Sequence, residues 1–139
     1  MSEDYKLPPE DYKQLLDSCE LESISLVKSS ALVKRENISE GLSISISEGA
    51  NFVNTDAGFE SEYAYTIRAT NKSKKQAIRL TCTFLVSYLS TEDITEDFFE
   101  IYKDLSLPFI VWPFFREYVY SQTSRMSIPP LTLPQIRRG

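Results

Sequence analysis

Closely spaced acidic side chains are the residues of this sequence whose types and spacing are suited to chemistry. Glu60 and Glu62 lie two positions apart, which puts both carboxylates on one face of a strand. Glu96 and Asp97 are neighbours in a segment with helical periodicity. Two carboxylates held close together can act as a general acid and a general base. A solvated acidic surface explains both pairs more simply, and we favour that interpretation.

The sequence lacks the residues that most other kinds of catalytic site require. The sequence contains no histidine and only two cysteines, Cys19 and Cys82, which lie far apart. Catalytic triads, Cys–His nucleophiles and His-containing zinc sites are therefore excluded. The four glycines form no phosphate-binding motif. We expect no metal, no cofactor and no enzymatic activity, and we interpret the cysteines as reduced core residues.

Composition and charge narrow the class further. Hydrophobic residues make up 42% of the 139 residues, which is typical of a globular chain, so we expect one domain over residues 1–139. The net charge is −5 and the basic residues are scattered, which argues against nucleic-acid binding. The N-terminus is not a secretory signal, and no apolar run approaches the roughly 20 residues of a membrane helix. We therefore expect a cytoplasmic protein without direct membrane insertion.

The elements that position these side chains follow from periodicity. Pro9 and the acidic residues after it predict a short helix over 9–18. Within 21–90 the period changes to two, as where Ile44 and Ile46 alternate with serines, which predicts half-buried antiparallel strands. There are four such strands with short separations, and we expect them to form a meander.

Helical periodicity returns after the strands. It predicts one helix over about 95–106, ended by Pro108, and a second over about 113–126 that begins at Pro113. Three prolines then predict an extended tail over 127–139. The fold class is α+β, a four-stranded antiparallel sheet followed by helices.

The segment PFFREYVYSQTSRMSIPPLTLPQI resembles the signature region of the SecB family of protein-export chaperones. Those proteins carry a Pro-aromatic-x-Arg-Glu helix, a later arginine and then a leucine–proline segment. The residues that match in order are Pro113, Phe114, Arg116, Glu117, Arg125, Pro130, Leu131, Leu133 and Pro134. The likeness extends to the layout of strands and to Leu21, Ile24 and Leu26 near the start.

One departure concerns the C-terminal end. SecB proteins usually continue past the leucine–proline segment into a last C-terminal helix, and this sequence stops at Gly139, so we expect that helix to be lacking. In SecB proteins that helix provides the lid over the client groove and part of the contact to the translocase motor SecA. The SecB family also has shorter members that serve toxin–antitoxin systems, and this chain is a candidate for that group.

The resemblance implies an ATP-independent holdase that binds unfolded or newly synthesised polypeptides and passes them to a partner such as SecA. It also implies a homotetramer, built as a dimer of dimers, or a homodimer. A second hypothesis is a dedicated interaction module for one partner, such as an antitoxin. The third hypothesis is an enzyme whose chemistry cannot be recognised in the sequence.

Three sets of residues are assigned on this basis. The expected client-binding residues are Phe52, Phe59, Tyr63, Phe109, Trp112, Leu131 and Leu133. The expected oligomer interface consists of Phe114, Phe115, Arg116, Glu117, Tyr118, Val119 and Arg125. Glu60 and Glu62 form the expected acidic face for docking a basic partner.

Overall fold

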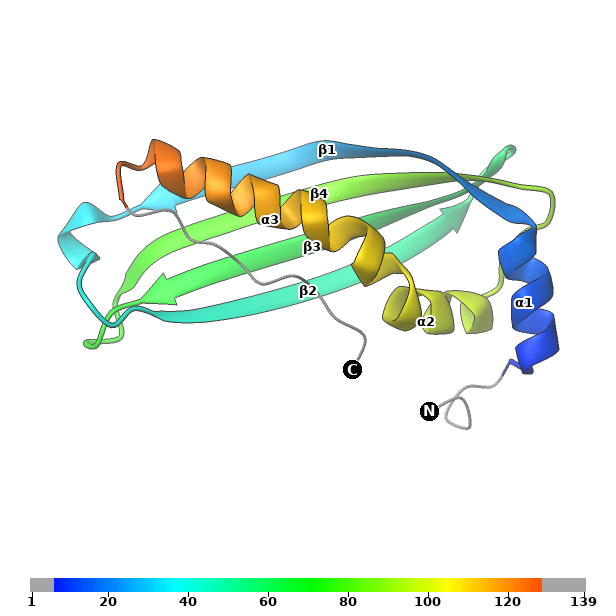
Figure 1. The fold of residues 1–139 in the computed structure, drawn as a ribbon, viewed down its shortest axis with the longest axis horizontal. Coiled ribbons are helices and arrows are strands. Elements are labelled where there is room, and N and C mark those ends of the chain that lie inside the picture. The colour runs from blue at the N-terminus through cyan, green and yellow to red at the C-terminus, as the bar shows by residue number, and fades with distance from the viewer. Residues whose placement is uncertain (1–6, 129–139) are drawn as a thin grey trace.

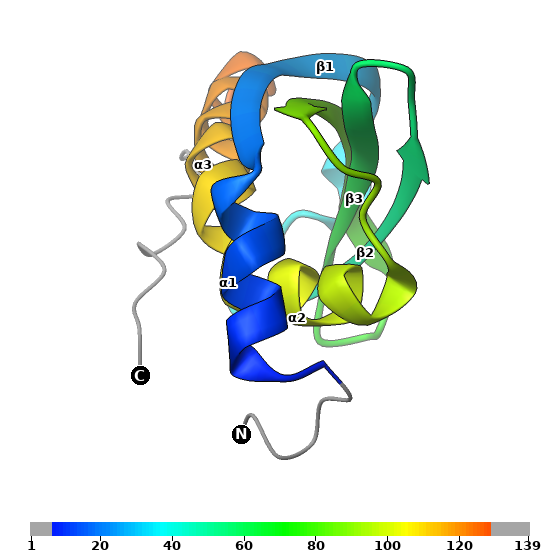
Figure 2. The same ribbon diagram turned by 90° about the vertical axis from the view of Figure 1, so that its right-hand side faces the viewer.

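A computed structural model describes residues 7–128 of the chain. One antiparallel sheet carries helices on one face and at one end (Figures 1 and 2). The α+β class predicted from periodicity is confirmed. The elements in chain order are α1 (Pro9–Asp17), β1 (Cys19–Val33), the 3-10 helix η2 (Arg35–Asn37), β2 (Ser43–Asn54), β3 (Gly58–Thr70), β4 (Gln76–Ser90), α2 (Glu96–Leu105) and α3 (Leu107–Arg125).

The strand order is β1-β4-β3-β2, so the expected simple meander is wrong for the first strand. β2, β3 and β4 follow one another as hairpins, whereas β1 pairs with β4 at the far side of the sheet. The connection through η2 crosses the end of the sheet between the two edge strands (Figure 1). Alternation in a sequence identifies a strand but does not specify its neighbour, which is why the pairing was missed.

Tight turns join the three hairpin strands. Between β2 and β3 the Thr55 N–H donates to the Gly58 carbonyl at 2.8 Å. A Cβ on Gly58 would lie 2.1 Å from the Tyr88 carbonyl oxygen, so this position accepts only glycine. Between β3 and β4 the Asn71 side-chain oxygen accepts the N–H of Lys75 at 3.0 Å. These turns fix the register of the sheet.

Helix α3 covers the centre of one sheet face, which we call the inner face. Its residues at four-residue steps point at the sheet, and Phe115 stacks on Tyr65 of β3 with ring centroids 4.1 Å apart. The buried stripe consists of Leu107, Val111, Phe115, Val119 and Thr123, each 0% exposed. The helix therefore forms one core with β3 and β4.

The start of α3 corrects the sequence prediction. The helix begins at Leu107, not at Pro113, so Pro113 lies inside it. Pro108 occupies the first turn, where a missing backbone N–H costs no helical hydrogen bond. Pro108 was expected to end the preceding helix, but it opens the next one. The tail predicted beyond the helix falls mostly on residues 129–139, outside the described residues.

Helices α1 and α2 close one end of the sheet (Figure 2). Thr95 caps α2 by accepting the Phe98 N–H at 3.1 Å. Tyr12 of α1 stacks on Phe98 with ring centroids 5.0 Å apart, and the Tyr102 hydroxyl donates to the Tyr88 hydroxyl at 2.7 Å. Within residues 7–128, no helix has the length and apolar character needed to cross a membrane.

Candidate binding surface

The inner face of the sheet is covered unevenly. Ile46 on β2 and Ile67 on β3 are directly opposite in the register, yet Ile46 is 40% exposed and Ile67 is 1% exposed. Leu26 on β1 and Phe84 on β4 are also directly opposite in the register, and they are 47% and 4% exposed. Helix α3 crosses the sheet diagonally over the two central strands, and its C-terminal end lies beside β1 (Figure 1). Parts of the inner rows of both edge strands stay exposed.

Two apolar strips result, one on each side of α3. We call Ile44 and Ile46 the β2 strip, and Leu21 and Leu26 the β1 strip, each residue being at least 40% exposed. Exposed apolar side chains gathered in rows are typical of surfaces that bind other polypeptides. The molecule therefore carries two candidate binding surfaces.

The backbone of β2 adds to its strip. The Thr55 N–H donates to the Gly58 carbonyl, so odd-numbered residues of β2 bond to β3 and even-numbered ones point their N–H and C=O groups at the free edge. Among residues 7–128, no strand pairs with that edge. The register of β2 runs without a shift, whereas β1 has two register shifts that distort its edge. β2 is therefore the more regular template of the two edges.

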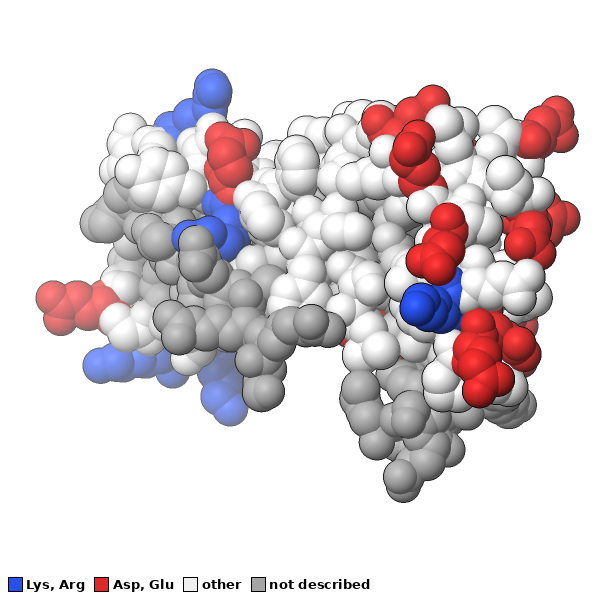
Figure 3. Space-filling view, turned by 45° about the vertical axis from the view of Figure 1, so that its right-hand side comes forward, with Lys and Arg blue, Asp and Glu red and all other residues white. Residues whose placement is uncertain are grey.

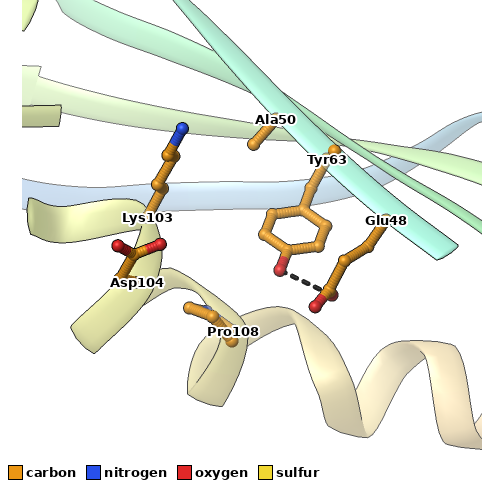
Figure 4. A pocket seen from close by; sticks show the side chains of 7 residues that line it. Glu48, Ala50, Tyr63, Lys103, Asp104 and Pro108 are labelled. Carbon is orange, nitrogen blue, oxygen red and sulfur yellow. Dashed lines mark hydrogen bonds between the residues drawn. The ribbon is translucent and has the colours of Figure 1, made fainter. Parts of the chain in front are cut away.

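A cavity of about 260 Å³ lies beyond the β2 strip, between β2 and the junction of α2 with α3 (Figure 4). The Tyr63 hydroxyl donates to the Glu48 carboxylate at 2.8 Å. Burial, together with the neighbouring Glu48 charge, raises the pKa of Tyr63 far above its usual range, so this hydroxyl remains a donor at neutral pH. The lining residues are Glu48, Gly49, Ala50, Tyr63, Lys103, Asp104 and Pro108.

Three predicted client-binding residues are half-buried near this region. Phe52 packs on Phe99 of α2 with ring centroids 4.8 Å apart, and Trp112 lies 5.9 Å from the Tyr65 ring. Phe109 is half-buried in the first turns of α3. Each leaves part of its surface accessible.

Two other predictions are corrected by burial. Phe59 is 0% exposed because it stacks on Tyr88 at 4.3 Å, and Tyr63 is 3% exposed beside Tyr65. Both belong to the core and offer no ring surface to a client in this conformation. The remaining two, Leu131 and Leu133, lie outside the described residues.

The expected oligomer interface divides into two faces of α3. Phe115, Tyr118 and Val119 are buried against the sheet, so assigning them to an interface with another copy is wrong. The apolar residues of α3 are spread around the helix, and only one face of the helix packs against the sheet. Phe114 is 46% exposed, and Glu117 and Arg125 are also exposed, while Arg116 is half-buried.

The acidic pair lies on the other face of the sheet, which we call the outer face. Glu62 is exposed and Glu60 half-buried, and both border a hollow of about 320 Å³ with Asn51, Val53 and Leu85. Acidic side chains also gather at the end formed by α1 and α2, as Figure 3 shows. Docking of a basic partner at Glu60 and Glu62 remains a prediction.

Sequence reasoning missed the two strips and Glu48. The alternation of Ile44 and Ile46 with serine showed one apolar row, but the same pattern fits a row that a helix covers. Within residues 7–128, no group of three or more His, Cys, Asp or Glu side chains is placed to hold a metal ion.

Comparison with known proteins gives a structural match. No protein-family model matches the chain, and no curated protein matches it either. A solved structure does match: the SecB-like chaperone Rv1957 of Mycobacterium tuberculosis, in complex with a ChAD peptide from the Rv1956 HigA1 antitoxin. It superposes with a TM-score of 0.81 at 23% sequence identity, covering 91% of this chain and 96% of that chain. The chain therefore has a SecB-like fold, as the resemblance of its C-terminal segment implied.

Proposed function

We propose that this protein is an ATP-independent chaperone that holds unfolded or newly synthesised polypeptides on the open strips of its inner sheet face. The observation that carries the proposal is the β2 strip, in which Ile44 and Ile46 stand 45% and 40% exposed beside a free strand edge. An exposed apolar row is stabilised when it binds another apolar surface, so such a row is typical of a binding site.

The strips suit weak and multiple contacts. Burying a few hundred Å² of apolar surface at about 25 cal/mol per Å² gives a modest affinity for one strip. Several strips that engage one client raise the total through avidity. We further propose a homodimer or homotetramer in which the exposed face of α3, including Phe114, contacts another copy, because assembly brings more strips to each client.

A dedicated partner is the second candidate. The solved relative is described in complex with an antitoxin peptide, which favours an antitoxin as the client of this chain too. General export is the other route. In that route the client is delivered to SecA. SecA would then dock on the acidic residues Glu60 and Glu62 of the outer face. In both cases we place the protein in the cytoplasm.

The test is suppression of aggregation. A chemically denatured test protein is diluted into buffer without ATP, with and without the chain, and light scattering is followed. We expect suppression at roughly stoichiometric amounts, together with an increase in solution mass on client binding. Scattering that is unchanged at a severalfold excess of the chain would contradict the proposal. Binding of one antitoxin segment, with no effect on other unfolded chains, would favour the dedicated partner.

A further inference from the structure

The outer face of the sheet carries opposite charges towards its two ends. Glu60 and Glu62 of β3 lie towards the end at which α1 joins β1 and β4 leads into α2. Arg68 follows on the same face of β3, about 20 Å beyond Glu62, and Arg79 of β4 is directly opposite Arg68. Glu62, Ala64 and Arg68 are all exposed, so this face is open. We call the two glutamates its acidic half and the two arginines its basic half.

The two arginines are unfavourably placed in a single copy of the chain. Like charges directly opposite each other on neighbouring antiparallel strands are destabilising. Over residues 7–128 neither guanidinium forms an ion pair with a carboxylate. Their neighbours on the two edge strands, Ser45 and Leu32, are uncharged. Carboxylates from another molecule would offset the repulsion, so the basic half fits an acidic surface.

The acidic half contains a space in which arginine side chains fit. Glu60 and Glu62 border the outer-face hollow of about 320 Å³, and no cation is among the described residues that line it. A guanidinium donates two parallel hydrogen bonds to a carboxylate, which makes arginine a good partner for such a site. The same face therefore carries both members of an Arg–Glu pair, and about 20 Å of strand keeps them apart within one copy.

The centre of the outer face permits the close approach of a second sheet. Gly49, Ala64 and Thr83 stand side by side in one row across β2, β3 and β4, and none of the three is large. On β3 the midpoint between Glu62 and Arg68 lies next to Ala64. A two-fold axis at this midpoint brings Glu62 of one copy to Arg68 of the other, and the same contact then forms a second time.

We propose that two copies of this chain pair through their outer faces, with the acidic half of each copy on the basic half of the other. The partner is a second copy because the two halves are complementary and lie at equal distances from the centre of one face. This inference goes beyond the proposed chaperone function, which uses the inner face. A basic protein that docks on Glu60 and Glu62 would compete with the second copy.

Size and charge predict the strength of this pairing. Four strands about 4.8 Å apart and about ten residues of about 3.3 Å each make at most roughly 600 Å² of contact on each copy. The two copies together then bury roughly 1,200 Å², which is the lower limit for specific interfaces. Ion pairs at an open surface contribute little each and are screened by salt. We therefore expect a dimer that forms at high protein concentration and weakens as the salt concentration rises.

The test exchanges the charges of the two halves and measures the dissociation constant by sedimentation over a series of protein concentrations. The variant Glu60→Lys with Glu62→Lys makes both halves basic, and the variant Arg68→Glu with Arg79→Glu makes both halves acidic. We expect the dissociation constant to rise at least about tenfold in each variant alone, because attraction becomes repulsion. An equimolar mixture of the two variants should restore pairing, and so should a chain that carries all four changes.

A control separates this pairing from a general effect of charge. The variant Glu96→Lys with Asp97→Lys makes the same change in charge on α2, where both side chains are exposed. It moves the net charge from −5 towards zero, which by itself favours association. Its dissociation constant should therefore not rise, whereas that of the variant at Glu60 and Glu62 should.

Three outcomes would overturn the inference. The first is an unchanged dissociation constant in either charge variant, and the second is a chain with all four changes that does not pair. The third is a chain that does not associate with itself but binds poly-glutamate through Arg68 and Arg79, because an acidic partner would then occupy the basic half. Aggregation suppression tests the chaperone function separately, since that function uses the inner face.

Discussion

Two isoleucines that face each other across neighbouring strands have different environments. Ile67 is 1% exposed under α3, and Ile46, its direct partner in the register, is 40% exposed at the sheet edge. Both belong to the same inner face and to strands with the same alternation. The comparison shows that whether a helix covers a row, and not which residues make it up, decides whether the row is buried or exposed. Helix α3 repeats the contrast in Phe115, which is buried, and Phe114, which is not.

The largest expected effect comes from the buried phenylalanine. Phe115→Ala should lower the free energy of unfolding by about 3–5 kcal/mol, because it removes a ring that is 0% exposed and stacks on Tyr65. Phe114→Ala should cost less than about 1 kcal/mol in the monomer and reduce the mass of any oligomer. Urea denaturation and solution mass measure the two quantities. Equal destabilisation by the two variants would contradict the division of α3 into two faces.

The paired isoleucines provide the next test. Ile67→Ala should cost about 2–5 kcal/mol, because it leaves a cavity under the helix. Ile46→Ala removes the same atoms from a side chain that is already 40% exposed, so we expect a loss below about 1.5 kcal/mol. The midpoints of urea unfolding report both. A loss at Ile46 as large as that at Ile67 would show that the β2 strip is covered.

Because the covered rows are shielded from water, the free energy of unfolding should depend on pH. Burial raises the pKa of the Cys82 thiol to about 12. Its stabilising contribution is complete below the pKa of the unfolded chain, about 8.5, and is lost as the pH rises towards 12. Removing this thiol in Cys82→Val should reduce the alkaline loss by up to about 1.4 kcal/mol per pH unit. Urea unfolding at several pH values between these limits measures it, and an unchanged slope would contradict a buried thiol.

The smallest effect concerns the helix that closes one end of the core. Thr95→Ala removes the side-chain acceptor of the Phe98 N–H and should cost about 1 kcal/mol. Thr95→Asp keeps an acceptor at the cap and serves as the control. Thermal unfolding followed by circular dichroism measures the difference. Equal losses in the two variants would show that the cap does not stabilise α2.

Local signals in the sequence were sufficient for the elements. The alternation through β2, β3 and β4 predicted strands, and the return of helical periodicity predicted α2. The resemblance of the segment after Pro113 predicted the SecB-like fold that the solved structure confirms. These features depend on residues a few positions apart, and such signals are readable from one chain.

Features that depend on distant contacts were not predictable. The pairing of β1 with β4 depends on the path of a crossing connection, and the start of α3 at Leu107 depends on packing that overrides the signal of Pro113. The burial of Phe59 and Tyr63 and the exposure of Ile46 depend on which rows the helices reach. Aromatic residues were predicted to bind clients, yet several of them are buried in the core.

The central claim is that the open strip binds clients, and one affinity comparison tests it most directly. The Kd for a labelled unfolded polypeptide is measured for the unchanged chain, for the double variant Ile44→Ser with Ile46→Ser, and for the control Ser45→Ala with Ser47→Ala on the opposite face of the same strand. The account predicts at least about a tenfold weaker Kd for the isoleucine variant, because it exchanges two apolar contacts for polar ones. The control should bind as the unchanged chain does. An isoleucine variant that folds normally and binds with unchanged Kd would contradict the account.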